Sequence, residues 1–439
     1  MEFLIKALQL ILSLSILVIL HEFGHFFFAK IFKTRVEKFY LFFNPGFSLF
    51  KFKKGETEYG IGWLPLGGYV KIAGMIDESM DKEQLKQPPQ PWEFRSKPAW
   101  QRLLIMVGGV LVNFILALFI FWMILFKWGE SYIPVEGARY GYSYHPIGHE
   151  IGLEDGDIIL SADTFKVETI SDVVRYILLE EPDSFTVQRG DSVFRLTVPD
   201  GLGQRFLSEG VKQFAQFRIP FVVDSVISGM PAEEAGIKKG DSLVAVGGTE
   251  APFFYEFVAE LNKYTGDTTI ISLYRDGVLM SLPVLVNKSG KIGIAPRSPS
   301  NYLEIKTNKY GFFEAFPAGI SRGVSVLVSY VKQLRLIFTR EGMRQVGGFG
   351  TIGSLFPASW DWLSFWRTTA FLSLILAFMN ILPIPALDGG HVLFLLYEMV
   401  TGRKPGEKFM EYAQLIGMIL LIALLLYANG NDIFRWLSE

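Results

Sequence analysis

The sequence predicts a multi-pass α-helical membrane protein with four transmembrane helices, a membrane-associated β-hairpin or small sheet, and an inserted pair of α+β domains. Half of the 439 residues are hydrophobic, 39 of them phenylalanine, and the mean hydropathy is positive. Four apolar segments are long enough to cross a hydrocarbon core about 30 Å thick at about 1.5 Å per helical residue. The stretch between the second and third segments contains an internal repeat, which indicates duplicated domains.

The four apolar segments cover residues 4–31, 103–126, 364–384 and 413–428. With their flanking residues they define transmembrane regions at 1–33, 103–128, 364–400 and 410–429. The first segment is not typical of a cleavable signal peptide. It begins with "MEF" rather than with a basic region, lacks a small-residue cleavage site and carries its polar residues at the far end. We therefore expect it to be a transmembrane helix.

Basic residues indicate how these helices cross the membrane. They are concentrated between the first and second spans, while the short tails contain few. By the positive-inside rule this loop is cytoplasmic, and both termini then lie outside the cytoplasm. The short turn with Arg403, Lys404 and Lys408 also falls inside, and residues 130–360 become a large extracytoplasmic insertion.

Composition also limits the chemistry. The formal net charge of -2 argues against a protein that binds nucleic acid. The sequence has no cysteine, which excludes disulfide bonds and thiolate metal sites. Any metal ion must therefore be held by nitrogen and oxygen ligands.

The stretch "ILVILHEFGHFFFAKIF", residues 16–32, contains two histidines and a glutamate inside an apolar span, in addition to Lys30 near its end. Such groups cost at least about 2.5 kcal/mol each at membrane depth, so they need a partner, a cavity or a function. His21 and His25 share one helix face and can present two nitrogens to one zinc ion. Glu22 beside them is placed to take a proton from a water molecule that the metal activates. The alternative is that all three are polar residues satisfied within a helix bundle.

A catalytic zinc ion needs a third protein ligand and an open fourth position. The segment "FMNILPIPALDGGHVLF", residues 378–394, offers two candidates. Pro383 and Pro385 break the third span, and irregular backbone survives at membrane depth only where it is buried in protein or lines a cavity. Asp388 follows them and is the preferred third ligand. His391 is the competing candidate.

The stretch "HPIGHE" contains another pair of histidines, His145 and His149, with helical i,i+4 spacing. Pro146 and Gly148 lie between them and argue against a regular helix. We therefore do not expect a second metal site there.

Two strings in the insertion align without a gap: "EIGLEDGDIILSADT" from Glu150 and "EAGIKKGDSLVAVGG" from Glu234, an offset of 84 residues. Each has a Gly where a helix would end, a Gly-Asp turn and an alternating apolar strand, and an amphipathic helix follows. The pattern resembles tandem PDZ domains of the bacterial, circularly permuted kind, at 135–212 and 213–298. Such domains bind extended peptides by strand addition, but these could equally be rigid spacers or steric gates.

The pairing of HExxH in the first span with N-x-x-P-x-P-x-L-D-G-G in a later one resembles the site-2 protease family of intramembrane zinc metalloproteases. The tandem repeat makes the chain most similar to the bacterial branch of the sigma-E regulator type. The strings "HEFGHFFFAKIF", "GIGWLPLGGYVKIAG", "NFILA" and "NILPIPALDGGHVLF" occur in the family's order. "GGVLVN" and "GGFGTIG" stand where the family commonly has Gly-Pro before the Asn and Gly-Pro-Ile, and neither departure touches the metal site.

The resemblance implies a Zn2+ cofactor held by His21, His25 and Asp388, with Glu22 as general base. It implies hydrolysis of peptide bonds within single-pass membrane proteins, such as anti-sigma factors or signal-peptide remnants, after an upstream site-1-type protease has trimmed the same substrate. It also implies a multi-pass protein of the bacterial inner membrane. The PDZ pair would lie outside the cytoplasm and gate the access of substrates from the lipid bilayer.

Two asparagines lie within the four apolar segments, Asn113 in the second and Asn380 in the third. An amide in apolar surroundings seeks a partner, and hydrogen bonding between helices is one interpretation. The resemblance favours Asn380 as a clamp on the substrate backbone. For Asn113 we expect a supporting role near the site, by polarising the scissile carbonyl.

The residues at 34–75 alternate aromatic or β-branched side chains around Asn-Pro-Gly and Gly-Gly turns, which predicts the small sheet. A protease needs its substrate unwound, and a sheet edge can accept an extended segment. Gly60 and Gly62 would allow such a segment to approach closely. The alternative is that the sheet only seals the cytoplasmic side.

A cytoplasmic connector is expected at 76–102, and an amphipathic helix on the outer membrane surface at 311–340.

Two other function classes are consistent with parts of the sequence. A catalytically idle membrane adaptor would recruit partners through its PDZ pair, but an intact HExxH with a matching Asp388 argues against it. A metal transporter would use the intramembrane histidines and aspartate as transport ligands. Glu22 beside the histidine pair and the PDZ insertion both favour the protease.

Overall fold

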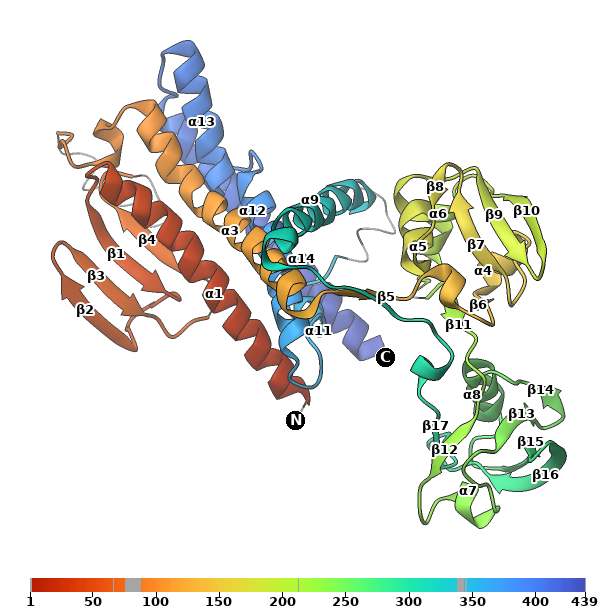
Figure 1. Ribbon diagram of the computed structural model, residues 1–439. Coiled ribbons are helices and arrows are strands. Elements are labelled where there is room, and N and C mark those ends of the chain that lie inside the picture. Colours follow the sequence, from red (N-terminus) through yellow and green to blue (C-terminus); the bar gives the residue numbers. More distant parts are fainter. Residues whose placement is uncertain are drawn as a thin grey trace. The chain divides into compact units, whose positions relative to one another are not determined.

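The computed structural model describes residues 2–65, 67–75, 88–211, 213–337, 343 and 346–438. The chain divides into two compact units. The membrane unit consists of Met1–Gly129 and Lys309–Glu439, and the inserted unit consists of Glu130–Asn308. In Figure 1 the inserted unit is mostly yellow and green, while the membrane unit has the red and orange of the beginning of the sequence and the blue of its end.

Four helices of the membrane unit are long and apolar enough to cross a membrane, which confirms the four predicted spans. They are α1 (Glu2–Ile31), α3 (Ala99–Trp128), α12 (Trp362–Ile381) and α14 (Glu407–Ser438). The third is shorter than predicted, because α12 ends before the proline-containing turn and a separate helix, α13 (Asp388–Thr401), follows it. The second begins earlier than predicted, directly after Pro98.

α1 and α3 run side by side (Figure 1) and cross with their backbones in close contact. At the crossing, Gly24 of α1 faces Gly108 of α3, and a Cβ atom on either glycine would collide with the backbone of the other. Small residues at a crossing are typical of membrane helices, which associate through van der Waals packing. The crossing brings α3 directly against the HEFGH segment.

A four-stranded sheet follows α1 and lies beside it (Figure 1). Its strands are β1 (Val36–Leu41), β2 (Phe50–Lys54), β3 (Thr57–Ile61) and β4 (Tyr69–Ile72), in the order β2-β3-β1-β4. β1 pairs in parallel with β3 and antiparallel with β4. A sheet is therefore present where the sequence predicts one, and β2 and β4 form its edges.

The order of the strands corrects the predicted role of Gly60 and Gly62. Gly60 lies in β3 and pairs with both neighbouring strands, so no free edge exists there. Gly62 donates its N–H to the carbonyl of Leu41. A Cβ atom on Gly60 would collide with the ring of Tyr40, and one on Gly62 with the backbone of Phe43. These glycines make room for the protein's own residues rather than for a substrate strand.

The chain after Lys309 belongs to the membrane unit, so the compact inserted unit covers only part of the predicted extracytoplasmic stretch 130–360. The predicted amphipathic helix corresponds to α9 (Phe312–Ile337), and residues 338–340 lie outside the described residues. α9 packs against α3, where the indole Nε1 of Trp122 donates to the carbonyl of Phe312 at 2.9 Å. α9 also contacts α12, and it is not among the described helices that are long and apolar enough to span a membrane.

The segment α11 (Phe349–Ser354) contacts both α1 and α14. Asp432 of α14 accepts hydrogen bonds from the backbone N–H groups of Gly348 and Thr351 at 2.9 and 3.0 Å. The "GGFGTIG" departure is thus anchored away from the histidine pair. Of the predicted connector, residues 76–87 lie outside the described residues.

The inserted unit contains the same arrangement twice. The first copy consists of β7 (Ile158–Ala162), β8 (Phe165–Lys166), α5 (Ile170–Leu179), β9 (Ser184–Arg189) and β10 (Ser192–Thr197). The second consists of β13 (Ser242–Val246), β14 (Thr249–Glu250), α8 (Phe254–Asn262), β15 (Thr268–Arg275) and β16 (Val278–Leu285). The strand orders β10-β9-β7-β8 and β16-β15-β13-β14 correspond, and each copy has its own hydrophobic core. The repeat in sequence is therefore a repeat in structure.

A buried aspartate closes the Gly-Asp turn of each copy. Asp157 and Asp241 are 0% and 1% exposed. Asp157 accepts two hydrogen bonds of 2.8 Å from Arg189, and Asp241 accepts bonds of 2.8 and 2.6 Å from Arg275. Each carboxylate also accepts a backbone N–H three residues earlier in the chain. The duplicated turn is thus held by the same ion pair twice.

The histidine pair of the insertion lies in a short helix, α4 (Pro146–Glu150), where the sequence argued against one. Pro146 occupies the first helical position, where a missing N–H costs nothing. His145 caps the helix, its Nδ1 accepting the N–H of Ile147 at 3.3 Å. His149 Nδ1 lies 2.9 Å from the carbonyl of Leu153. Both imidazoles therefore contact the local backbone.

The remaining short elements complete the two units. In the inserted unit they are β5 (Glu130–Tyr132), η2 (Val135–Gly137), β6 (Tyr142–Tyr144), α6 (Leu202–Ser208), β11 (Ala215–Phe217), β12 (Val223–Val226), α7 (Pro231–Glu234), β17 (Ile294–Pro296), η3 (Pro299–Asn301) and β18 (Lys306–Asn308). In the membrane unit η1 (Phe94–Ser96) precedes α3.

Candidate metal centre

Two histidines of α1 face the interior of the membrane unit. His21 and His25 are 8% and 5% exposed, and their Nε2 atoms lie 3.2 Å apart. One turn of helix separates them, so both rings lie on one face. The Nδ1 of His25 lies 2.8 Å from the carbonyl oxygen of Ile105. This nitrogen therefore carries the proton, and the Nε2 lone pair is left for a metal ion.

Asp388 reaches the same point from a distant part of the chain. α12 ends at Ile381, and Pro383 and Pro385 do not continue it. Ala386 then adopts a left-handed conformation with φ of 77°, which costs an alanine about 1–2 kcal/mol. The turn ends at Asp388, the first residue of α13. The irregular backbone thus orients the carboxylate.

Three donor atoms converge at this point. The Oδ2 of Asp388 lies 3.2 Å from His21 Nε2 and 3.4 Å from His25 Nε2. Among the described residues, this is the one group of three His, Asp or Glu side chains with ligand atoms close enough to share a metal ion. Oδ2 is buried and accepts no hydrogen bond from the described residues, so its lone pairs stay available. Two imidazole nitrogens and one carboxylate oxygen fit a catalytic zinc ion.

A cavity of about 640 Å³ adjoins the three donor atoms. Glu22 and Asn380 line it together with the two histidines and Asp388. The amide nitrogen of Asn380 lies 3.4 Å from His21 Nε2. The Cγ of Glu22 lies 3.5 Å from where a Cβ atom on Gly68 would stand. The structure thus brings Glu22 and Asn380 to the predicted metal ligands.

The edge strand β4 forms another wall of the cavity, which residues 67–72 line. In the sheet β4 pairs only with β1, so its other side is free of strand pairing among the described residues. The phenolic O–H of Tyr69 donates a hydrogen bond to the Oδ1 of Asn44 at 2.9 Å, and the ring of Tyr69 stacks on that of Tyr40. Burial, with smaller contributions from Tyr40 and Glu58, raises the pKa of Tyr69 to about 12. The phenol therefore stays a neutral donor at physiological pH.

Comparison with known proteins assigns the chain to a family. The sequence model of Peptidase family M50 matches residues 9–424. The chain belongs to this family. A regulator of sigma E protease from Haemophilus influenzae and the regulator of sigma-E protease RseP from Escherichia coli are each 28% identical to it, over 99% of this chain and 100% of their own length. A Vibrio cholerae protein named as a candidate zinc metalloprotease is 28% identical over 97% of each chain.

The protein is therefore a multi-pass intramembrane zinc metalloprotease of the site-2 protease family. The resemblance to the site-2 protease family, which rests on the HExxH and N-x-x-P-x-P-x-L-D-G-G motifs, is confirmed. The predicted enzyme class and zinc cofactor are confirmed as well. The metal-transporter and idle-adaptor alternatives no longer apply.

Gly109 also lies at the metal site of this M50 protease, and it was not identified from the sequence. A Cβ atom on Gly109 would lie 2.7 Å from Cε1 and 2.8 Å from Nδ1 of His21, and it would collide with Nε2 of His25. Glycine is therefore required for α3 to approach the imidazoles this closely. The signal was the pair Gly108-Gly109 within an apolar span, because glycine in a membrane helix marks close packing.

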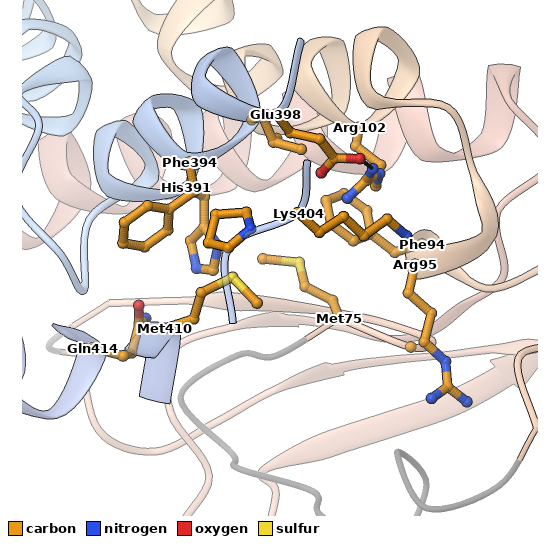
Figure 2. A pocket seen from close by; sticks show the side chains of 13 residues that line it. Met75, Phe94, Arg95, Arg102, His391, Phe394, Glu398, Lys404, Met410 and Gln414 are labelled. Atoms are coloured by element: carbon orange, nitrogen blue, oxygen red, sulfur yellow. Dashed lines mark hydrogen bonds and ion pairs between the residues drawn. The ribbon is translucent and has the colours of Figure 1, made fainter. Parts of the chain in front are cut away.

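His391 is not part of the group of three donor residues. It lies one turn after Asp388 on α13 and lines both the cavity and an adjoining pocket of about 100 Å³. Figure 2 shows this pocket, where the largely buried Arg102 and Glu398 form an ion pair at 2.5 Å. The pair joins α3 to α13, and it thereby helps to fix the helix that begins with Asp388.

Asn113 is fully buried in α3, and its Nδ2 lies 3.4 Å from Nδ1 of His21. It is not among the residues that line the cavity. The predicted contact with a substrate carbonyl therefore lacks geometric support. Asn113 lies instead behind His21, on the side of the ring away from Asp388.

Proposed function

We propose that this protease cleaves peptide bonds within the transmembrane segments of single-pass membrane proteins, with His21, His25 and Asp388 as zinc ligands and Glu22 as general base. The main support is the convergence of three ligand atoms beside a cavity that Glu22 also lines. His21, Glu22 and His25 lie within a helix that is long and apolar enough to span a membrane. A substrate bond has to reach them at membrane depth.

In the proposed reaction, a water molecule adds across the scissile C–N bond. Bound zinc would polarise the carbonyl group and lower the pKa of the water. Glu22 accepts a proton from the water as its oxygen bonds to the carbonyl carbon, and it returns a proton to the leaving nitrogen as the C–N bond breaks. Asn380 donates its amide N–H to the substrate backbone and holds the chain in register.

The proposal includes strand pairing between the substrate and β4. A helical peptide bond is shielded by its own hydrogen bonds, so the substrate must be extended before attack. The free side of an edge strand can pair with an extended segment, and residues 67–72 line the cavity beside Glu22. A sheet that only sealed the cytoplasmic side would not need an edge strand at the cavity.

We also propose that the two repeats of the inserted unit are PDZ-like domains that gate the access of substrates. Their shared α+β topology and matching Gly-Asp turns support the likeness. The distribution of basic residues favours an extracytoplasmic position for the repeats and for both termini in a bacterial inner membrane. The names of the relatives, which refer to the regulation of sigma-E, favour anti-sigma-factor-like substrates. The proposal also includes prior trimming of the substrate by a site-1-type protease, with signal-peptide remnants as a second class of substrate, as the family resemblance implies.

Deletion of residues 135–295 tests the gate. A steric gate predicts that the shortened protein keeps its zinc and cleaves substrates that retain bulky outer domains. Loss of cleavage of already trimmed substrates would favour a recruiting role for the repeats instead.

The activity itself is tested by expressing Glu22→Gln beside the wild type and comparing the membrane proteomes. Full-length single-span proteins should accumulate only in the variant, because an amide cannot act as a base at neutral pH. Turnover of such a substrate should fall at least about a hundredfold. Glu56→Gln is the matched control, since Glu56 is exposed between β2 and β3. Near wild-type cleavage by Glu22→Gln would refute the assigned base.

A further inference from the structure

The two histidines differ in what their second ring nitrogen contacts. In a neutral imidazole, one nitrogen carries the proton and the other carries a lone pair. A histidine that binds zinc through Nε2 must therefore donate from Nδ1, and the partner of Nδ1 must be an acceptor. His25 meets this requirement, because its Nδ1 lies 2.8 Å from the carbonyl oxygen of Ile105.

His21 faces the amide of Asn113 instead. The Nδ2 of Asn113 lies 3.4 Å from His21 Nδ1, and two N–H donors cannot bond to each other. The Oδ1 of the same amide is buried and has no hydrogen-bond partner among the described residues. The two ends of an amide are distinguished only by the hydrogen bonds they make.

A half-turn of the Asn113 amide resolves the mismatch. It brings Oδ1, an acceptor, to the Nδ1–H of His21. At the other end of the amide, Oδ1 as placed has no hydrogen-bond partner among the described residues, so the half-turn gives up no hydrogen bond there. The backbone carbonyl of Asn113 accepts a hydrogen bond from the hydroxyl of Ser373 at 2.7 Å. This bond ties the same turn of α3 to α12.

We propose that Asn113 is a positioning residue of the metal centre: its Oδ1 accepts the Nδ1–H of His21 and keeps the Nε2 lone pair directed at the zinc ion. This inference rests on the proposed role of His21 as a ligand. Outer partners of this kind fix the tautomer and orientation of the ring, and their loss typically lowers metal affinity about 10–100-fold.

The zinc affinity of the purified full-length protein, measured by competition with a chelator, tests the inference. Asn113→Leu keeps the size of the side chain and removes the acceptor, so the affinity should fall about 10–100-fold. Asn113→Asp keeps an acceptor and should bind zinc within about threefold of the wild type or more tightly. Ser373→Ala is the matched control, because it removes a neighbouring buried hydrogen bond without touching the ring.

Wild-type affinity in Asn113→Leu would overturn the inference, and so would a tenfold loss in Asn113→Asp, which would mean that the amide donates to His21. Where Asn113→Leu fails to fold, the cobalt-substituted Asn113→Asp protein decides. A carboxylate draws the Nδ1 proton more strongly, so the visible ligand-field bands should shift, and an unchanged spectrum would refute the contact. Zinc retained by His21→Ala would instead refute His21 as a ligand, which separates the two failures.

Discussion

Buried carboxylates have different surroundings in the two units of this protease. In the inserted unit, Asp157 and Asp241 each accept two hydrogen bonds from an arginine and one from the backbone. In the membrane unit, Asp388 faces the Nε2 atoms of two histidines, and its Oδ2 accepts no hydrogen bond from the described residues. The first two carboxylates are paired within the protein, while we propose that Asp388 is paired with a cation.

The difference shows how a buried charge indicates its role. A buried carboxylate whose two oxygens both accept hydrogen bonds from the protein holds a fold together, and removing its partner leaves an uncompensated charge. A buried carboxylate whose lone pairs converge with those of imidazoles offers the donor set of a metal site. We expect substitutions in the two units to have separate effects, on zinc content in one and on local stability in the other.

The largest expected effect is the loss of the metal itself. His21→Ala, His25→Ala and Asp388→Ala should each lose most of the bound zinc, because three protein ligands leave no redundancy. Elemental analysis of the purified protein, with about one zinc per chain in the wild type, measures this. His391→Ala is the control and should keep its zinc. Full retention by Asp388→Ala would mean that the third ligand lies elsewhere.

A smaller effect is expected where the backbone meets the rings. Gly109→Ala places a Cβ atom 2.7 Å from Cε1 of His21, so the imidazoles must shift. The zinc affinity should fall at least about tenfold, as it does when ligand orientation is lost. Gly430→Ala in α14 meets no atom within 4 Å and should bind zinc like the wild type. Equal zinc affinities of the two variants would show that α3 can move away from α1 at the crossing and make room for the added Cβ atom.

The inserted unit should respond through stability instead. Asp241→Ala leaves the guanidinium of Arg275 without its buried partner, which should lower the free energy of opening of β13 and β15 by about 3 kcal/mol. Asp224→Ala removes an exposed pair with Lys239 and should cost less than about 1 kcal/mol. Hydrogen exchange in the full-length protein measures both, and zinc content should not change. Zinc loss in Asp241→Ala would contradict the separation of the two units.

The sequence was sufficient for those parts of this protein that depend on local pattern. Long apolar runs predict the spanning helices, and the one-turn spacing of His21 and His25 predicts their common face. The choice of Asp388 as the candidate third ligand could also be made from the sequence, because an aspartate after two prolines at membrane depth has few other roles. An ungapped alignment revealed the duplicated fold.

The parts that required the structure depend on contacts between distant segments. The parallel pairing of β1 with β3 places Gly60 inside the sheet and leaves β4 as the edge at the cavity. Nothing local distinguishes β3 from β4 in the sequence. In the same way, the contact of Asn113 with His21 depends on where α3 crosses α1. Register and crossing angle are set by packing, which a single sequence does not display.

The two repeats also differ from each other at the end of their first strand. The second has Gly247-Gly248, while the first has Asp163-Thr164 at the equivalent position. Asp163 and Gly247 both have positive φ, 48° and 58°, so the turn is the same. The carboxylate of Asp163 accepts the backbone N–H groups of Asp183 and Ser184 and the hydroxyl of Ser184 at 2.8–3.0 Å. These bonds stabilise a left-handed residue that glycine adopts without strain.

The smallest expected effect tests this substitute for glycine. Burial alone would raise the pKa of Asp163, but the hydrogen bonds from Ser184 and Asp183 hold it below its ordinary value. The folded state thus favours the charged form, and this contribution is present at pH 7 and lost as the pH falls through the lowered pKa. Asp163→Asn keeps the left-handed preference without the charge, so at pH 7 it should lower the free energy of opening at Ser184 by about 1 kcal/mol.

Hydrogen exchange of the Ser184 amide in the full-length protein measures that loss. The difference from the wild type should shrink below about pH 4, because the wild-type carboxyl is then increasingly protonated as well. Asp191→Asn, in the exposed turn between β9 and β10, is the control and should have no effect at either pH. A difference that persists undiminished in acid would mean that the amide fits the turn poorly. In that case the negative charge of Asp163 would not stabilise the turn of the first repeat, and the turn would be no more stable than the glycine turn of the second repeat.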